Sequence, residues 1–223
     1  MTFSIAATDG SGRFGIAVSS SSPAVAARCA HLRDGVGAVS SQNITDPRLG
    51  TALLDRLQAG YSAQEAIDAV VQESPAVDYR QLVVLDANGG SAVFSGERTL
   101  GVFGEGRGPN SVAAGNMLAA PGIAQVLCDA FEATAGELEV RLMAALRAAV
   151  AAGGEAGPVR SAGLSVVSGH GWRDTDLRVD WHDRPIEQLE ELLEVWLPQR
   201  QDYVVRGLDP AASISYGVAG DER

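Results

Sequence analysis

The chain has 223 residues, which suits one domain with a substantial buried core. Its net charge of −11 at pH 7 argues against binding to nucleic acid or anionic lipid, and small molecules remain open as partners. All 17 basic residues are arginine, which excludes Schiff-base chemistry, a phosphate-binding lysine and a lysine general base within the chain.

The cysteines and the hydropathy pattern bear on the compartment. Cys29 and Cys128 lie far apart in apolar runs, where a buried free thiol is more common than a disulfide or a metal ligand. No stretch resembles a signal peptide, and none offers about 18 uninterrupted apolar residues for a membrane span. We therefore expect a cytoplasmic protein that is not bound to a membrane.

The chain opens with a predicted hairpin. Residues 2–9 and 13–19 form its strands and Gly10-Ser11-Gly12 its turn. Both strands carry apolar or small residues on both faces, which is typical of strands buried from two sides. Residues 24–32 and 35–42 are also β-prone, so four strands are expected before any helix.

The first strand begins at a hydroxyl residue, Thr2, which follows only Met1. Removal of Met1 would leave a free α-amino group with a pKa near ~7.7–8.0, which can accept the proton of the threonine hydroxyl. Thr2 would then be a nucleophile that carries its own base. The alternative is that Thr2 is simply the first residue of a strand.

A helix pair follows. The first helix is predicted from the cap at Thr45-Asp46-Pro47 to Gly60, and the second from the capping box Ser62-Ala63-Gln64-Glu65 to Pro75. Strands are then predicted over residues 80–86 and 91–96, joined at Asn88-Gly89, and over 100–104. The glycine-rich residues 104–109 lack the spacing of a phosphate loop and are predicted to be a loop.

The rest of the chain repeats this alternation. Two more helices are predicted, one from Pro121 and one from Glu137 to Gly153, followed by strands over 161–168 and 175–181 and a helix from Pro185. We expect residues 1–198 to form a single domain and residues 199–223 a loosely attached tail. Two sheets packed face to face, each covered by helices, would bury all these elements, so the predicted fold is α+β, a four-layer αββα sandwich.

This order, with a hydroxyl residue heading the first strand, resembles that of the N-terminal nucleophile (Ntn) hydrolases, which include proteasome β-subunits. More closely, the sequence resembles a bacterial family of similar length that is catalogued as a domain of unknown function and placed in that superfamily. The resemblance spans almost the whole chain, and the stretches that carry it are residues 2–5, 35–42, 80–81, 115–118, 160–162 and 176–180.

The resemblance implies that Thr2 is the nucleophile. The candidates for stabilising the developing negative charge are the neutral polar residues Asn116 and Gln42, each of which could instead make only turn or strand-end hydrogen bonds. Proteasome-like enzymes place a lysine near the nucleophile, and in this lysine-free chain Arg28, on the predicted third strand, is the candidate replacement.

Substrate selection would also depend on arginine, whose planar fork pairs with a carboxylate. Arg80 and Arg160 each stand at the start of a predicted strand and are the candidate substrate-binding residues. Both could instead cap a sheet edge in solvent.

One predicted strand has a charged face that a sandwich covered on both sides does not explain. Three interpretations are open, namely a solvent-exposed sheet edge, a subunit interface, and a site for substrate or metal. The charged face consists of Asp176, Arg178, Asp180 and His182.

We expect a metal-independent, cofactor-free hydrolase that acts on a small amide, ureide or peptide bond. The alternative is a non-catalytic domain that keeps the sandwich for binding or oligomeric assembly. The many Ala and Gly residues in the predicted elements add little burial per residue, so a homodimer is expected as an additional source of buried surface.

Overall fold

The computed structural model describes residues 1–221. The strands are β1 (Thr2–Thr8), β2 (Phe14–Ser20), β3 (Ala30–Arg33), β4 (Gly37–Asn43), β5 (Arg80–Asp86), β6 (Ser91–Ser95), β7 (Gly104–Gly108), β8 (Ser111–Asn116), β9 (Ser161–Val167) and β10 (Arg173–Val179). The α-helices are α1 (Val25–Cys29), α2 (Pro47–Gln58), α3 (Ala63–Glu73), α4 (Ile123–Ala133), α5 (Leu138–Ala151), α6 (Pro185–Trp196) and α7 (Arg200–Leu208).

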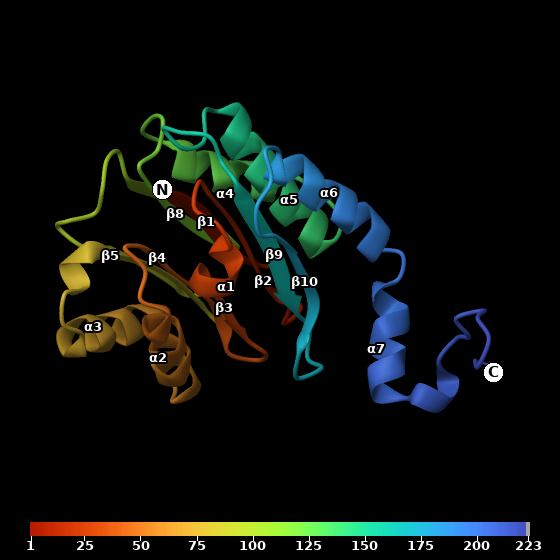
Figure 1. Cartoon of the computed structure of the whole chain (residues 1–223). Helices are drawn as coiled ribbons and strands as arrows, with labels where there is room; N and C mark the ends of the chain where they lie inside the picture. Colours follow the sequence, from red (N-terminus) through yellow and green to blue (C-terminus); the bar gives the residue numbers. More distant parts are fainter. Residues whose placement is uncertain (222–223) are drawn as a thin grey trace.

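The strands form two antiparallel sheets. One has the order β10-β9-β2-β1-β8-β7 and the other the order β3-β4-β5-β6. The sheets face each other, with α4, α5 and α6 on the outer face of the larger sheet and α2 and α3 on that of the smaller one (Figure 1). The predicted α+β fold, with two sheets that helices cover, is confirmed. None of the described helices is long and apolar enough to span a membrane.

Strand β1 is central, paired with β2 on one side and β8 on the other. Side chains alternate between the two faces of a strand. Phe3 and Ile5 therefore pack under α4 and α5. Ala6 faces the smaller sheet and belongs to the apolar cluster between the two sheets, which includes Val83 of β5. Both faces of β1 are buried, as the absence of polar alternation in the sequence indicates.

The helix starts follow from local side-chain chemistry. Asp46 accepts the backbone N–H of Arg48 at the start of α2, and Ser62 and Glu65 form a reciprocal capping box at the start of α3. Each helix then buries a single apolar stripe against the smaller sheet. Both predictions are confirmed to within a few residues.

The predicted strand over residues 24–32 is wrong, because most of it is the short helix α1. Ala24 turns the chain with a left-handed backbone (φ 51°) and donates its N–H to the carbonyl of Asp180 at 2.9 Å. Helix α1 packs on β2 and β9, and a Cβ at Gly163 would lie 2.4 Å from the Cβ of Ala26. Close approach of α1 therefore depends on this glycine.

The prediction for residues 100–109 is also wrong. No strand covers residues 100–103, and most of the predicted loop over 104–109 is instead strand β7, paired with β8. The glycines that suggested a loop serve packing: a Cβ at Gly106 would lie 2.2 Å from the backbone oxygen of Ala124 in α4. Here α4 lies so close to β7 that a side chain would not fit.

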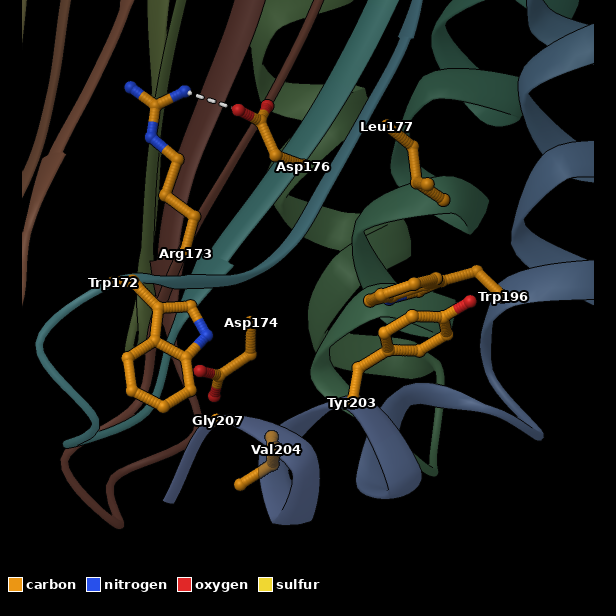
Figure 2. A pocket seen from close by; sticks show the side chains of 9 residues that line it. All are labelled: Trp172, Arg173, Asp174, Asp176, Leu177, Trp196, Tyr203, Val204 and Gly207. Atoms are coloured by element: carbon orange, nitrogen blue, oxygen red, sulfur yellow. Dashed lines mark hydrogen bonds and ion pairs between the residues drawn. The ribbon is translucent and has the colours of Figure 1, made fainter. Parts of the chain in front are cut away.

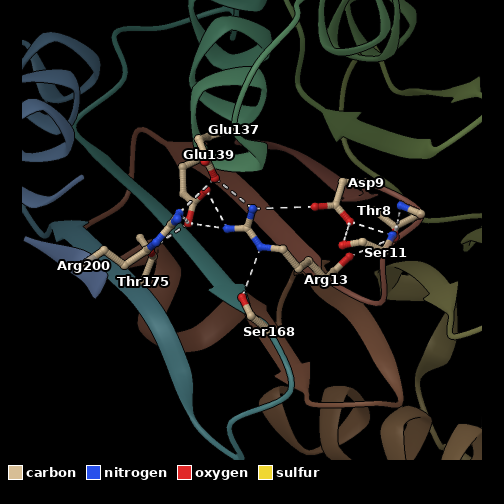
Figure 3. A network of polar contacts seen from close by, with 10 residues as sticks. Thr8, Asp9, Ser11, Arg13, Glu137, Glu139, Ser168, Thr175 and Arg200 are labelled. Carbon is tan, nitrogen blue, oxygen red and sulfur yellow. Dashed lines mark hydrogen bonds and ion pairs between the residues drawn. The ribbon is translucent and has the colours of Figure 1, made fainter. Parts of the chain in front are cut away.

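Helix α7 lies in residues 199–223, where no helix was predicted, and extends away from the sheets (Figure 1). A network of ion pairs and hydrogen bonds joins Arg200, the first residue of α7, to α5 and the larger sheet (Figure 3). Glu139, fully buried at the start of α5, accepts hydrogen bonds from Arg13 at 2.9 Å and from Arg200 at 2.8 Å. Thr175 of β10 donates to the same carboxylate at 3.0 Å.

Candidate functional site

Thr2 lies where the sequence places it, at the start of the central strand. Its side chain shares the face between the sheets with Ser4 and is only 4% exposed. Thr2 Oγ1 donates to the carbonyl oxygen of Met1 at 2.5 Å and lies 3.3 Å from Ser20 Oγ at the end of β2. The Ser20 hydroxyl donates to the same carbonyl oxygen, so two hydroxyl groups converge on the carbonyl that precedes Thr2.

Thr2 and Ser20 belong to a row of polar residues that continues across the neighbouring strands. Asn116 pairs with Thr2 from β8, and Ser161 pairs with Ser20 from β9. Asn116 is fully buried and donates through Nδ2 to Gln81 Oε1 at 3.0 Å. Within residues 1–221, its Oδ1 atom is buried and accepts no hydrogen bond. A polar row beside Thr2 thus contains an acceptor that no protein donor satisfies.

Gln42 joins the same network from the opposite sheet. Its Nε2 donates to Gln81 Oε1 at 2.8 Å and to the carbonyl of Ala114 at 3.1 Å, and its Oε1 accepts the Ser4 hydroxyl at 2.7 Å. Both predicted polar candidates, Asn116 and Gln42, therefore reach the layer that holds Thr2. Both donors of Gln42 are therefore engaged within the protein, and Gln42 holds the side chain of Gln81 in place.

Glu155 is a buried acid at the same end of the molecule. It pairs with Leu118 in an isolated bridge, and its Oε2 accepts the Ser21 N–H at 3.0 Å. Burial raises the pKa of Glu155 to about 7, although the N-terminal ammonium group and the hydrogen bonds from Ser21 lower it. A carboxyl with this pKa exchanges its proton near neutral pH.

Arg28 lies on α1 and not on a strand, so its predicted placement is wrong. Its guanidinium donates to Ser22 Oγ at 3.0 Å and to the carbonyl of Pro23 at 2.8 Å. Ser22 Oγ in turn lies 2.9 Å from Ser20 Oγ. Arg28 therefore reaches the row through Ser22, one hydroxyl removed from Ser20, and is not beside Thr2 itself.

Arg160 and Arg80 both hold neighbouring segments of chain. Arg160 forms an ion pair with Asp183, and its backbone N–H donates to the carbonyl of Ser20 at 2.8 Å. Arg80 donates to the carbonyl of Ile44, whereas its buried Nε atom has no partner within residues 1–221. Arg160 thus lies next to the polar residues around Thr2, and each guanidinium donates to a neighbouring segment through one nitrogen atom.

The charged face of β10 lies at an edge of the larger sheet. Asp176 accepts hydrogen bonds from Ser165 and Arg173, and Arg178 lies 3.9 Å from Asp180. Asp176 and Arg178 are exposed, which fits the interpretation of a solvent-exposed edge. No group of three His, Cys, Asp or Glu side chains within residues 1–221 is arranged to hold a metal ion.

Two of the cavities in the described part of the chain lie one at each end of the larger sheet. An aromatic cleft of about 560 Å³ lies between β10 and α7, lined by Trp172, Trp196 and Tyr203 among others (Figure 2). Register places this cleft at the far end of the sheet from Thr2, because Arg173 pairs with Val167, which pairs with Phe14 at the other end of β2. The second cavity, of about 290 Å³, is lined by residues 153–155 and 157–159 and lies at the Thr2 end.

Ser20, Gln81 and Glu155 lie in this region but were not predicted from the sequence as site residues. Ser20 belongs to a run of four serines after an apolar strand, a pattern that marks a strand end but not the strand that it adjoins. Gln81 meets Gln42 only through the β4–β5 register. Glu155 follows two glycines in a segment without periodicity, so its burial has no sequence signal.

Residues 2–189 match the model of a family described as "Family of unknown function (DUF1028)". The crystal structure of a Silicibacter pomeroyi protein, described with the same family, superimposes with a TM-score of 0.83 at 29% identity, covering 91% of this chain and 93% of that one.

A more distant match is Anbu, an ancestral β-subunit from Yersinia bercovieri, with a TM-score of 0.41 at 12% identity over 88% of this chain and 97% of that one. No curated protein matches the chain. The family model covers most of the chain, from the first strand into the last helix of the body. The chain therefore belongs to the DUF1028 family.

Proposed function

We propose that this protein is an N-terminal nucleophile hydrolase that cleaves a small amide, ureide or peptide bond with Thr2 after removal of Met1. The observation that carries the proposal is the position of Thr2 Oγ1, which is buried at the start of the central strand, 3.3 Å from the Ser20 hydroxyl and paired in register with Asn116. The order of sheets and helices, which resembles that of the Ntn hydrolases, supports the same assignment.

In the proposed reaction, Thr2 Oγ1 attacks the carbonyl carbon of the substrate amide and its proton passes to the freed α-amino group. The C–N bond breaks as the leaving amine takes that proton, and an ester remains on Oγ1. Water then attacks the ester carbonyl and gives one proton to the α-amino group. The C–O bond breaks, the proton returns to Oγ1 and the carboxylic acid leaves.

The surrounding residues suit this chemistry. Ser20 already donates to a carbonyl oxygen next to Thr2, so its hydroxyl is suited to stabilise an oxyanion at that place. Gln81 Oε1 accepts from both Gln42 and Asn116, which fixes the orientation of the Asn116 amide. Arg28 holds Ser22 against Ser20 and so orients the Ser20 hydroxyl without touching the substrate.

A turnover screen tests the proposal. Protein whose N-terminal residue is verified by mass as Thr2 is assayed against small amides, ureides and dipeptides, with the Thr2→Ala protein as the blank. We expect hydrolysis that depends on Thr2 and is unaffected by chelators. Equal rates in the two proteins, or complete retention of Met1 in the natural host, would instead favour a non-catalytic domain that uses the sandwich for binding or assembly.

A further inference from the structure

Met1 is held by contacts that resemble recognition of a ligand. Its carbonyl oxygen accepts the hydroxyls of Thr2 and Ser20. Its side chain lies against Gly157, where an added Cβ would come within 3.0 Å of the Met1 Cε atom and 3.6 Å of its Sδ atom. The residue that must leave to free Thr2 therefore has specific partners for both its carbonyl and its side chain.

Glu155 lies at the same end of the larger sheet, and within residues 1–221 one of its carboxylate oxygens accepts no hydrogen bond. It is 4% exposed and lines the cavity of about 290 Å³ that Gly157 also lines. One carboxylate oxygen accepts the N–H of Ser21, the neighbour of Ser20, whereas the other is buried and has no partner within residues 1–221. A buried carboxylate oxygen without a donor is costly, and a cationic ligand would satisfy it.

From these contacts we propose that the place vacated by Met1 is the acyl-side substrate site, and that it binds an α-aminoacyl amide with a free ammonium group and an unbranched apolar side chain. The ammonium group pairs with Glu155, the carbonyl lies against the Ser20 hydroxyl within reach of Thr2, and the side chain lies over Gly157. This assignment of substrate class rests on the proposed function of Thr2.

Charge and shape both favour this class over an acidic substrate. The nearby guanidinium of Arg160 is paired with Asp183, and the other charged residues that line the cavity, Asp183, Arg184 and Glu187, are exposed. The buried ionisable group that faces the vacated place is therefore the carboxyl of Glu155. Gly153, Gly154 and Gly157 supply no side chains to this wall, which leaves room for a straight side chain such as that of methionine.

Binding is measured first, because it does not require turnover. The probes are L-methioninamide, N-acetyl-L-methioninamide and glycinamide, titrated calorimetrically into processed Thr2→Ala protein, which cannot acylate. We expect L-methioninamide to bind about tenfold or more tightly than its acetylated form, since acetylation removes the cation. Equal binding of the two, or binding of neither, would overturn the assignment.

Two substitutions divide the site into its parts. Glu155→Gln keeps the side-chain size and should remove the preference for the free ammonium group, whereas Glu194→Gln, an exposed carboxylate on α6, should keep it. Gly157→Val should weaken binding of L-methioninamide about tenfold and leave glycinamide unchanged. Thermal melting of each variant identifies any loss of fold, and an unchanged preference in folded Glu155→Gln would contradict the proposal.

Turnover separates failure of this inference from failure of the proposed function. Processed protein is assayed with L-methionine p-nitroanilide and its N-acetyl form. Thr2-dependent cleavage of both at equal rates would leave the hydrolase in place and remove the role of Glu155. Equal loss of both activities in Glu155→Gln would mean that Glu155 pairs with the Thr2 amino group and not with the substrate, and would also overturn the inference.

Discussion

At the scale of single residues, Glu155 links the candidate site to pH. Its pKa of about 7 in the folded chain lies above the ordinary value of 4.5, because burial disfavours the charged form. The folded state therefore binds more protons than the unfolded state between these two values. Stability from this group is complete below about pH 4.5 and declines as pH rises toward 7.

This linkage predicts a difference between the wild type and Glu155→Gln. Relative to the variant, the wild-type free energy of unfolding should fall by roughly 2–3 kcal/mol between pH 4 and pH 8, since the glutamine does not titrate. Urea unfolding of both proteins across this range measures it. Parallel pH profiles of the two proteins would show that Glu155 titrates normally.

Ser20 gives a second prediction at this scale. Ser20→Ala should lower kcat of the processed protein by about 10- to 1000-fold with a small change in KM, because the hydroxyl acts on charge that develops in the transition state. Ser19→Ala is the matched control, since Ser19 is buried on the same strand but bonds to the carbonyl of Ser161. Equal losses in both variants would count against a direct role for Ser20.

At the scale of elements, the sequence correctly predicted the helix starts that depend on side chains close by in the chain. The caps at Asp46 and Ser62 placed α2 and α3, since a side chain and a backbone N–H two or three residues away are sufficient for a cap. Strand β7 and helix α1 were missed because their stability comes from neighbours distant in sequence. Thr2, Asn116 and Gln42 were candidates through the resemblance to the Ntn hydrolases, whereas Glu155 depends on a contact with Ser21 that no pattern encodes.

The buried network at α5 predicts a large effect on stability. Glu139→Ala should lower the free energy of unfolding by about 3 kcal/mol, because it leaves the guanidinium groups of Arg13 and Arg200 without their buried carboxylate. Glu137→Ala, whose half-exposed side chain contacts the same two arginines, should cost less than about 1 kcal/mol. Chemical denaturation measures both, and similar losses would mean that burial of Glu139 adds nothing.

At the scale of the whole molecule, the two sheets have unequal sizes, with six strands in one and four in the other. The smaller sheet packs on β1, β2, β8 and the end of β9, and α1 packs beside it on β2. The C-terminal segment leaves the body as α7 and carries large apolar residues that are more than half exposed, namely Leu208, Ile214, Tyr216 and Val218. Such exposure in an acidic chain is typical of a subunit contact.

We therefore expect a homodimer that buries this segment. Light scattering of the wild type should give twice the chain mass, and the double variant Ile214→Asp, Val218→Asp should give the mass of one chain with an unchanged melting temperature. A wild-type monomer at every concentration would contradict the expectation. A dimer that survives both substitutions would place the contact on another surface.

The central claim is that the hydroxyl of Thr2 is acylated, and mass spectrometry tests it most directly. Processed protein is treated with an activated p-nitrophenyl ester and digested, and the N-terminal peptide is then weighed before and after neutral hydroxylamine, which cleaves esters but leaves amides intact. The account predicts one acyl group on Thr2 that hydroxylamine removes, and none of that kind in Thr2→Ala. An N-terminal peptide that carries only hydroxylamine-stable acyl groups in both proteins would contradict the account.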